Sequence, residues 1–209
     1  MNIMRTVALT KESTKDILEN LLKRSPNNYG KFESAVDEIL HKVKTEGDSA
    51  LFAYTKEFDK TEICADTIKV TEEEIKEAYE AVDPALIDVI RKALVNIRSY
   101  HEKQRQNSWF TSETNGTMLG QKVTALERVG VYVPGGKAVY PSSVLMNIVP
   151  AKVAGVDQIV MTTPPGKDGK VNPSTLVAAK EAGADEIYKV GGAQAIGALA
   201  YGTESIPKV

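Results

Sequence analysis

The sequence contains few of the residues on which metal or redox sites are usually built. Its 209 residues include one cysteine, Cys64, and two histidines, His41 and His101. A single cysteine excludes a disulfide within the chain and a zinc site made of several cysteines. No run approaches the ~18 apolar residues that a transmembrane helix needs, and the N-terminus lacks a secretory cleavage pattern. We therefore expect a cytoplasmic protein with no membrane partner.

A surplus of positive charge is also missing. Lysine and arginine total 26 against 28 for aspartate and glutamate, a formal net charge of −2. Binding to nucleic acid needs basic residues gathered on one face, so we expect no nucleic-acid partner. The 42% of hydrophobic residues is enough for the core of one large domain or two small ones.

Glycine and proline are unevenly distributed. Thirteen of the 15 glycines and seven of the nine prolines follow Asn115. Few glycines and prolines are typical of long helices, whereas glycines and prolines at regular intervals are typical of alternating strands and helices. The sequence therefore predicts a helical N-terminal region followed by an α/β region.

In the first half, apolar spacing and capping residues predict several helices and one hairpin. The first expected helix ends before Ser25-Pro26 and buries Ile17, Leu18, Leu21 and Leu22, and the second spans about Phe32–Lys44. A third, short helix is expected to begin with Asp48 as its N-cap, and a fourth at the capping box Thr71–Glu74. The fifth is expected to run from Asp83-Pro84 to about Gln106 and to bury Leu86, Ile90, Ala93, Leu94, Ile97 and Tyr100. Between Trp109 and Leu126, alternation around Asn115-Gly116 predicts a β-hairpin.

The second half alternates strand-like and helix-like segments. Strands are expected at about 129–133, 158–161 and 186–190, and helices at 142–154, 172–183 and 193–201, with a kink at Pro150. This order predicts an incomplete Rossmann-like parallel βαβαβα domain. A fourth strand would be expected after Val209, since a three-stranded sheet leaves an open edge. We therefore expect the sequence to be part of a longer protein.

Two loops of this domain carry ligand-binding signals. One contains Tyr132, Pro134 and Gly135, and the other contains Gly192 and Gln194. Both follow strands, and the carboxyl ends of parallel strands form the crevice in which ligands bind in open α/β sheets. Glycine admits an anion close to the backbone, and a glutamine offers a donor and an acceptor. A nucleotide or phosphate is the predicted ligand; a plain tight turn and a Gln194 that caps its helix or faces solvent remain the alternatives.

The other reactive residues form no catalytic arrangement. Cys64 has no histidine or glycine-rich turn near it in the sequence, and both histidines are expected on the solvated faces of helices. The acidic runs contain no distinctive pair of carboxylates.

Five segments together resemble histidinol dehydrogenase. They are RVGVYVPGG at 128–136, YPSSVLMN at 140–147, PAKVAG at 150–155, GGAQAI at 191–196 and AYGTESIPKV at 200–209. The resemblance implies a homodimeric, zinc-dependent and NAD-linked enzyme that oxidises L-histidinol to L-histidine through L-histidinaldehyde. It implies NAD contacts at Tyr132 and Gln194, with Pro134, Gly135 and Gly192 as further contacts.

The resemblance also implies what this chain lacks. The zinc ligands and the Glu-His acid–base pair of the family have no counterpart here, so no catalytic or metal-binding residue is expected and the chain alone should be inactive. The implied organisation is an N-terminal helical arm (1–25), a helix-rich first segment of a discontinuous domain (26–128) and a truncated NAD-binding domain (129–209). Two alternatives remain: a nucleotide-binding or dimerisation module without catalysis, and an aldehyde-dehydrogenase-like enzyme using a cysteine nucleophile.

Overall fold

The computed structural model describes residues 8, 10–15, 30–135 and 139–209. The chain divides into two compact units, residues 1–38 and 39–209. In the first unit, residues 11–15 are helical. The helix expected around Ile17–Leu22 lies outside the described residues. Helix α2 (Gly30–Glu46) spans the boundary between the units and is slightly longer than predicted.

Four helices follow in the first half: α3 (Asp48–Phe58), α4 (Ala65–Ile68), α5 (Glu72–Ala81) and α6 (Pro84–Glu102). Helices were predicted at the positions of α3, α5 and α6, whereas α4 was not predicted. The capping box is confirmed, because Thr71 Oγ1 accepts from the backbone N–H of Glu74 and the Glu74 carboxylate accepts from that of Thr71. The Asp83-Pro84 start is confirmed as well, with the Asp83 carboxylate accepting from Ala85 N–H.

Three local expectations were wrong. Asp48 does not cap α3, because its carboxylate instead accepts hydrogen bonds from the backbone and hydroxyl of Ser205. Helix α6 ends at Glu102 rather than near Gln106. Leu86 and Tyr100 are 40% and 63% exposed, whereas the neighbouring Ile87 and Ile90 are buried. The rest of the expected face is confirmed, because Ile90 is buried and Ala93, Leu94 and Ile97 pack against the core.

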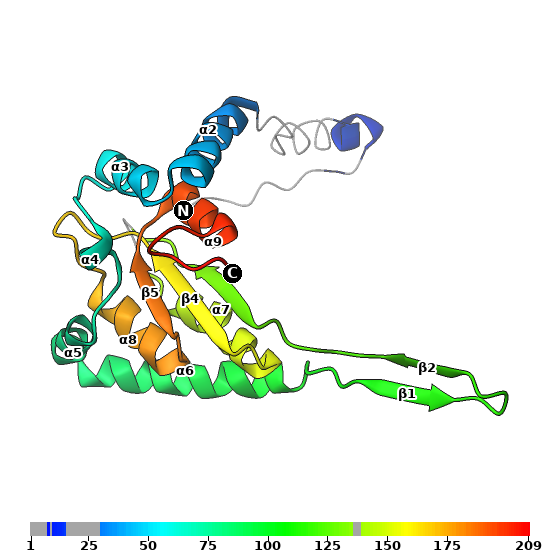
Figure 1. Ribbon diagram of the computed structural model, residues 1–209. Coiled ribbons are helices and arrows are strands. Elements are labelled where there is room, and N and C mark those ends of the chain that lie inside the picture. Colours follow the sequence, from blue (N-terminus) through cyan, green and yellow to red (C-terminus); the bar gives the residue numbers. More distant parts are fainter. Residues whose placement is uncertain (1–7, 9, 16–29, 136–138) are drawn as a thin grey trace. The chain divides into compact units, whose positions relative to one another are not determined.

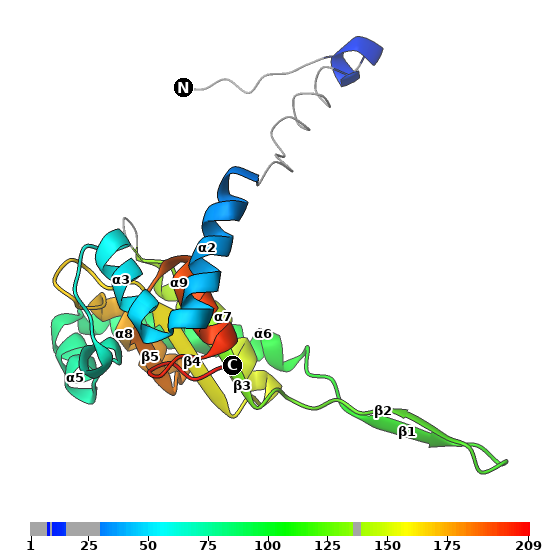
Figure 2. The same cartoon turned by 45° about the horizontal axis from the view of Figure 1, so that its top comes forward.

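The predicted hairpin is present as β1 (Trp109–Ser112) and β2 (Met118–Gln121), which pair antiparallel. All eight strand residues are exposed. Figures 1 and 2 both show the hairpin extending away from the parallel sheet of the same unit. Its apolar side chains therefore contribute little to the core described below.

The predicted βαβαβα domain is confirmed as the chain order β3 (Arg128–Tyr132), α7 (Pro141–Ala154), β4 (Gln158–Thr163), α8 (Pro173–Ala182), β5 (Glu186–Lys189) and α9 (Gly192–Tyr201). The strands lie in the order β3-β4-β5 and all pair parallel. Gly155 and Gly183 end α7 and α8 at φ of 88° and 93°, a left-handed conformation that glycine adopts without steric cost. Pro150 lies inside α7, which continues past it.

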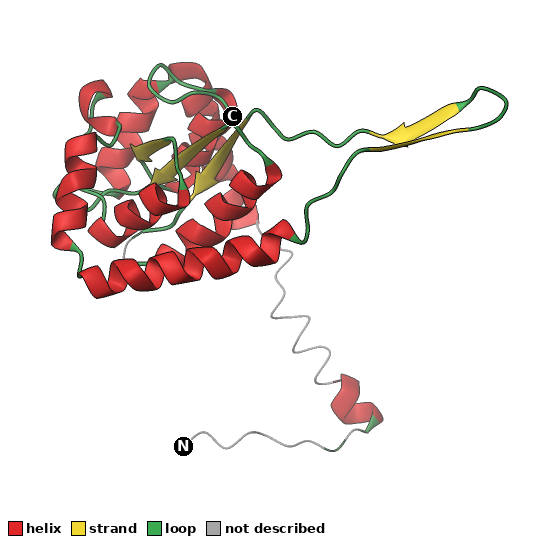
Figure 3. Cartoon of the chain, turned by 90° about the horizontal axis from the view of Figure 1, so that it is seen from below, coloured by secondary structure: helices red, strands yellow, loops and turns green. Residues whose placement is uncertain are grey.

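Helices cover both faces of this sheet (Figure 3). On one face, Ile159, Met161 and Ile187 belong to a core cluster with residues of α5, α6, α7 and α8. On the other face, Val160, Tyr188 and Val190 belong to a cluster with residues of α2, α3 and α9. The edge of the sheet at β5 is not open, because the backbone N–H of Val70 donates a hydrogen bond to Ile187 O and Lys69 forms an isolated antiparallel β-bridge with Tyr188. Burial on both faces leaves the carboxyl ends of the strands as the place for a ligand.

Candidate functional site

The two loops singled out in the sequence meet at the carboxyl edge of the sheet. Tyr132 is the last residue of β3, and Gly192 is the first residue of α9. The backbone N–H of Gly192 donates a hydrogen bond to the hydroxyl of Tyr132, with the two atoms 3.3 Å apart. The structure therefore brings together two predicted site residues that lie 60 positions apart in the chain.

Pro164, in the loop after β4, lies between the same two loops. A Cβ added to Gly135 would come within 2.7 Å of the Pro164 ring, and one added to Gly191 within 2.6 Å of it. Both glycines are thus needed for close packing against one proline. Sequence reasoning missed Pro164; its position directly after a buried strand, in a Pro-Pro pair, is the signal that could have found it.

The first turn of α9 contains an unusual glutamine. Gln194 is 1% exposed, and neither its Nε2 nor its Oε1 has a hydrogen-bond partner among the described residues. The alternative that Gln194 caps the helix or faces solvent is therefore wrong. Gly192 has a φ of 65°, and a Cβ there would contact Gln194 Oε1. Buried amides are nearly always hydrogen-bonded, so this carboxamide is a strong candidate for contact with a bound group.

A cavity of about 380 Å³ adjoins this edge. Pro134 and Gly135 line it from the loop after β3, Pro164 from the loop after β4, and Asn172 and Thr175 from the beginning of α8. Of the predicted site residues, Pro134 and Gly135 line this cavity, whereas Tyr132, Gly192 and Gln194 are not among the described residues that line it. The free backbone N–H groups at the beginning of a helix favour an anionic group nearby.

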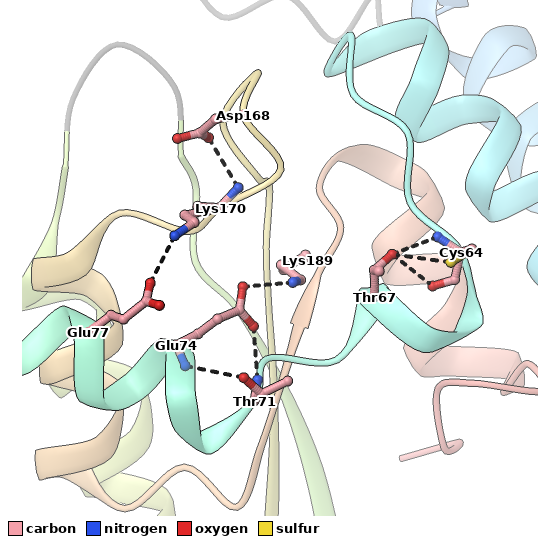
Figure 4. Close-up of polar contacts among 8 residues, drawn as sticks. All are labelled: Cys64, Thr67, Thr71, Glu74, Glu77, Asp168, Lys170 and Lys189. Carbon is pink, nitrogen blue, oxygen red and sulfur yellow. Dashed lines mark hydrogen bonds and ion pairs between the residues drawn. The ribbon is translucent and has the colours of Figure 1, made fainter.

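Ion pairs hold α5 against the sheet and the loop after β4 (Figure 4). Lys189, the last residue of β5, is 6% exposed, and its Nζ lies 2.9 Å from Glu74 Oε1. Lys170 Nζ lies 2.8 Å from Glu77 Oε2, and the backbone N–H of Lys170 donates to Asp168. The turn that carries Gly191 and Gly192 therefore begins next to the end of β5, which the ion pair between Lys189 and Glu74 holds in place.

The remaining reactive residues stay apart from this arrangement. Cys64 is exposed at the beginning of α4, where a hydrogen bond with the Thr67 hydroxyl lowers the pKa of its thiol (Figure 4). His41 is exposed, and His101 Nδ1 pairs with Gln104 Oε1 at 2.7 Å. In the described ranges, no three His, Cys, Asp or Glu residues come close enough to hold a metal ion. None of the described helices is long and apolar enough to cross a membrane.

Comparisons with known proteins show which proteins this chain is similar to. The family model described as histidinol dehydrogenase matches residues 22–209. Histidinol dehydrogenase of Bacillus subtilis (strain 168) is 60% identical over 174 residues, which are 83% of this chain and 40% of the relative. That of Methanocaldococcus jannaschii is 54% identical over 95% of this chain and 46% of the relative. The crystal structure of histidinol dehydrogenase from Elizabethkingia anophelis matches with a TM-score of 0.80 and 39% identity, over 85% of this chain and 41% of that one.

The chain thus spans about two fifths of the length of the curated relatives. The residues that the family model matches include both loops of the site. The family model covers nearly the whole chain, and a solved member shares its fold. The chain belongs to the histidinol dehydrogenase family of oxidoreductases.

Proposed function

We propose that this chain is the NAD-binding part of a histidinol dehydrogenase of histidine biosynthesis. Tyr132 and Gln194 would hold the dinucleotide, and Pro134, Gly135 and Gly192 would be further contacts. The observation that carries the proposal is the buried carboxamide of Gln194, which lies in the first turn of a helix and has no partner in the described part of the chain. When bound, NAD⁺ supplies the acceptor for a hydride.

Each residue has a distinct task in this proposal. Tyr132 presents an aromatic ring and a hydroxyl at the end of β3, and the hydroxyl already holds the Gly192 turn. Gln194 offers one donor and one acceptor to a ribose or an amide. Gly135 and Gly192, which carry no side chain, leave the backbone accessible to the ligand. The cavity beside Pro134 and Gly135 provides room for part of the dinucleotide.

Titration of the 209-residue chain with NAD⁺ by isothermal calorimetry tests this proposal. We expect saturable binding by the wild type and loss of most of the affinity in Tyr132→Ala. Tyr100→Ala, which removes an exposed tyrosine from α6, is the matched control and should bind as the wild type does. Absence of binding by the wild type, or equal affinity in Tyr132→Ala, contradicts the proposal.

We further propose that the whole protein oxidises L-histidinol to L-histidine through L-histidinaldehyde with NAD and zinc, and that this chain alone does not. The described residues do not fit zinc, since they hold no group of three suitable ligands. Measurable turnover of histidinol by the purified chain with zinc and NAD⁺ would overturn the proposal that this chain alone is inactive.

The family resemblance also leads us to propose a homodimer, and the hairpin is the surface that supports it. Trp109, Phe110, Met118 and Leu119 are all more than half exposed. An isolated two-stranded hairpin is only marginally stable in water, and a large exposed apolar patch is typical of an interface. A second copy of the chain is the partner that we propose for it.

A further inference from the structure

A second buried polar group without a partner lies on the strand next to β3. Thr162, on β4, is fully buried, and its Oγ1 has no hydrogen-bond partner among the described residues. Side chains alternate between the two faces along a strand. Ile159 and Met161 face the α7 and α8 side, whereas Val160 faces the α9 side. Thr162 therefore faces α9, as Val160 does.

Gln194 and Thr162 lie at the same level of the sheet. Leu199, near the end of α9, packs against Gly130, since a Cβ there would come within 2.9 Å of Leu199 Cδ1. The beginning of α9 is instead bonded to Tyr132, two residues further along β3. The helix thus crosses the sheet antiparallel to the strands. Its first turn, which contains Gln194, reaches the level of Tyr132, whose register partner on β4 is Thr162.

We propose that Thr162 is a positioning residue for Gln194, linked to its carboxamide through one buried water molecule. The proposal rests on the function proposed above, in which Gln194 contacts NAD. A buried hydroxyl and a buried amide each lose free energy when left without partners, and one water molecule with two to four hydrogen bonds can satisfy both. A carboxamide can be turned by 180° about its last bond, which exchanges its donor and its acceptor. The link to Thr162 selects the orientation that the cofactor meets.

Cofactor affinity gives the first test. Thr162→Val removes the hydroxyl and keeps the shape, while Thr162→Ser keeps the hydroxyl. We expect Thr162→Val to weaken NAD⁺ binding about fivefold, the equivalent of one hydrogen bond, and Thr162→Ser to stay within about twofold of the wild type. Thr55→Val is the matched control, because Thr55 is an equally buried threonine whose hydroxyl donates within its own helix to Leu51 O. Equal affinity in Thr162→Val and Thr55→Val overturns the proposal.

A double-mutant cycle tests the link without the cofactor, so its result stands even if the chain binds no NAD. Thermal unfolding is measured for the wild type, Thr162→Val, Gln194→Leu and the double variant. If the two groups share hydrogen bonds, Thr162→Val lowers the midpoint of the wild type by a few degrees but not that of Gln194→Leu. Additive shifts overturn the proposal. If Thr162→Val does not fold, Thr162→Ala, which also removes the hydroxyl, takes its place in the cycle, and additive shifts overturn the proposal there as well.

Discussion

The hydroxyl of Tyr132 accepts a hydrogen bond from the backbone N–H of Gly192, 3.3 Å away, and so joins the end of β3 to the beginning of α9. Both residues border the proposed cofactor site. Gly192 is exposed, so water can replace the tyrosine hydroxyl if the bond is lost. The bond therefore holds the turn in place more than it stabilises the fold.

Tyr132→Phe separates these two effects. We expect the free energy of unfolding to change by less than about 1 kcal/mol, because the released N–H is solvated. NAD⁺ affinity should fall severalfold, and the amide hydrogen of Gly192 should exchange faster with solvent. Calorimetry and hydrogen exchange measure the two quantities. Unchanged exchange at Gly192 would show that the bond does not hold the turn.

Gly192→Ala should disturb the site through Gln194. The residue has a φ of 65°, and its new Cβ would contact Gln194 Oε1, which is buried and cannot move into solvent. We expect a loss of about 1–2 kcal/mol from the backbone conformation, together with at least tenfold weaker NAD⁺ binding. Urea unfolding and calorimetry give both values.

Gly116→Ala is the control for that variant. Gly116 also has a positive φ, of 85°, but nothing lies within 4 Å of the position of its Cβ. It should show the backbone cost while NAD⁺ affinity is retained. If both variants lose affinity equally, the effect does not come from Gln194.

The features that the sequence predicted correctly depend on residues close together in the chain. The capping box at Thr71 and the glycine ends of α7 and α8 are set within three or four positions, so their chemistry can be read locally. Alternation of short strands and helices was enough for the parallel sheet. The convergence of Tyr132 and Gly192 follows from that topology, because parallel strands end at one edge.

The features that were missed depend on distant partners. Asp48 has the residue type of an N-cap, but Ser205, 157 positions away, binds its carboxylate instead. The burial of Gln194 depends on how α9 packs on the sheet, and the role of Pro164 depends on two glycines from two other loops. Helical spacing identified an apolar face on α6 but could not show that Leu86 and Tyr100 would remain exposed.

The hairpin provides a test of the proposed dimer. Trp109 and Leu119 share one face, because Trp109 lies opposite Gln121, and Leu119 lies opposite Thr111. We expect Trp109→Ser combined with Leu119→Ser to convert a dimer to a monomer in sedimentation equilibrium. Val95→Ser, at an equally exposed apolar position on α6, should leave the mass unchanged. A monomeric wild type, or a double variant that remains dimeric, contradicts the role proposed for the hairpin.

Lys189→Met should destabilise the protein because it leaves Glu74 without its cation. The ammonium is almost fully buried, and the Glu74 side chain is 21% exposed. We expect a loss of about 2–4 kcal/mol in urea unfolding. Adding Glu74→Gln should recover part of it, since glutamine keeps the capping contact to Thr71. Lys170→Met, whose pair with Glu77 is about 60% exposed on both sides, should have little effect. A double variant no more stable than Lys189→Met would contradict this account.

Glu181 should make stability depend on pH. Its carboxylate accepts hydrogen bonds from Arg91 Nε and Nη2 at 3.0 and 2.8 Å and from the Tyr79 hydroxyl at 2.8 Å. The Arg91 guanidinium is the main cause that lowers the pKa of Glu181, while burial and this carboxylate raise the pKa of Tyr79 to about 12. A lowered carboxyl pKa stabilises the folded state above about pH 4.5, and the contribution is lost as the pH falls through the folded value.

Glu181→Gln removes this charge and keeps the shape of the side chain. At pH 7 we expect it to lower the free energy of unfolding by about 1–2 kcal/mol, because the charged hydrogen bonds become neutral ones. At pH 3, below the ordinary glutamate pKa, more of the wild-type carboxyl is protonated than at pH 7, so the difference between the two proteins should be smaller. Urea unfolding at both pH values gives the comparison, with Glu77→Gln, in an exposed ion pair, as the control that changes little at either pH. A deficit in Glu181→Gln that is as large at pH 3 as at pH 7 would mean that the side chain acts through packing and not through its charge.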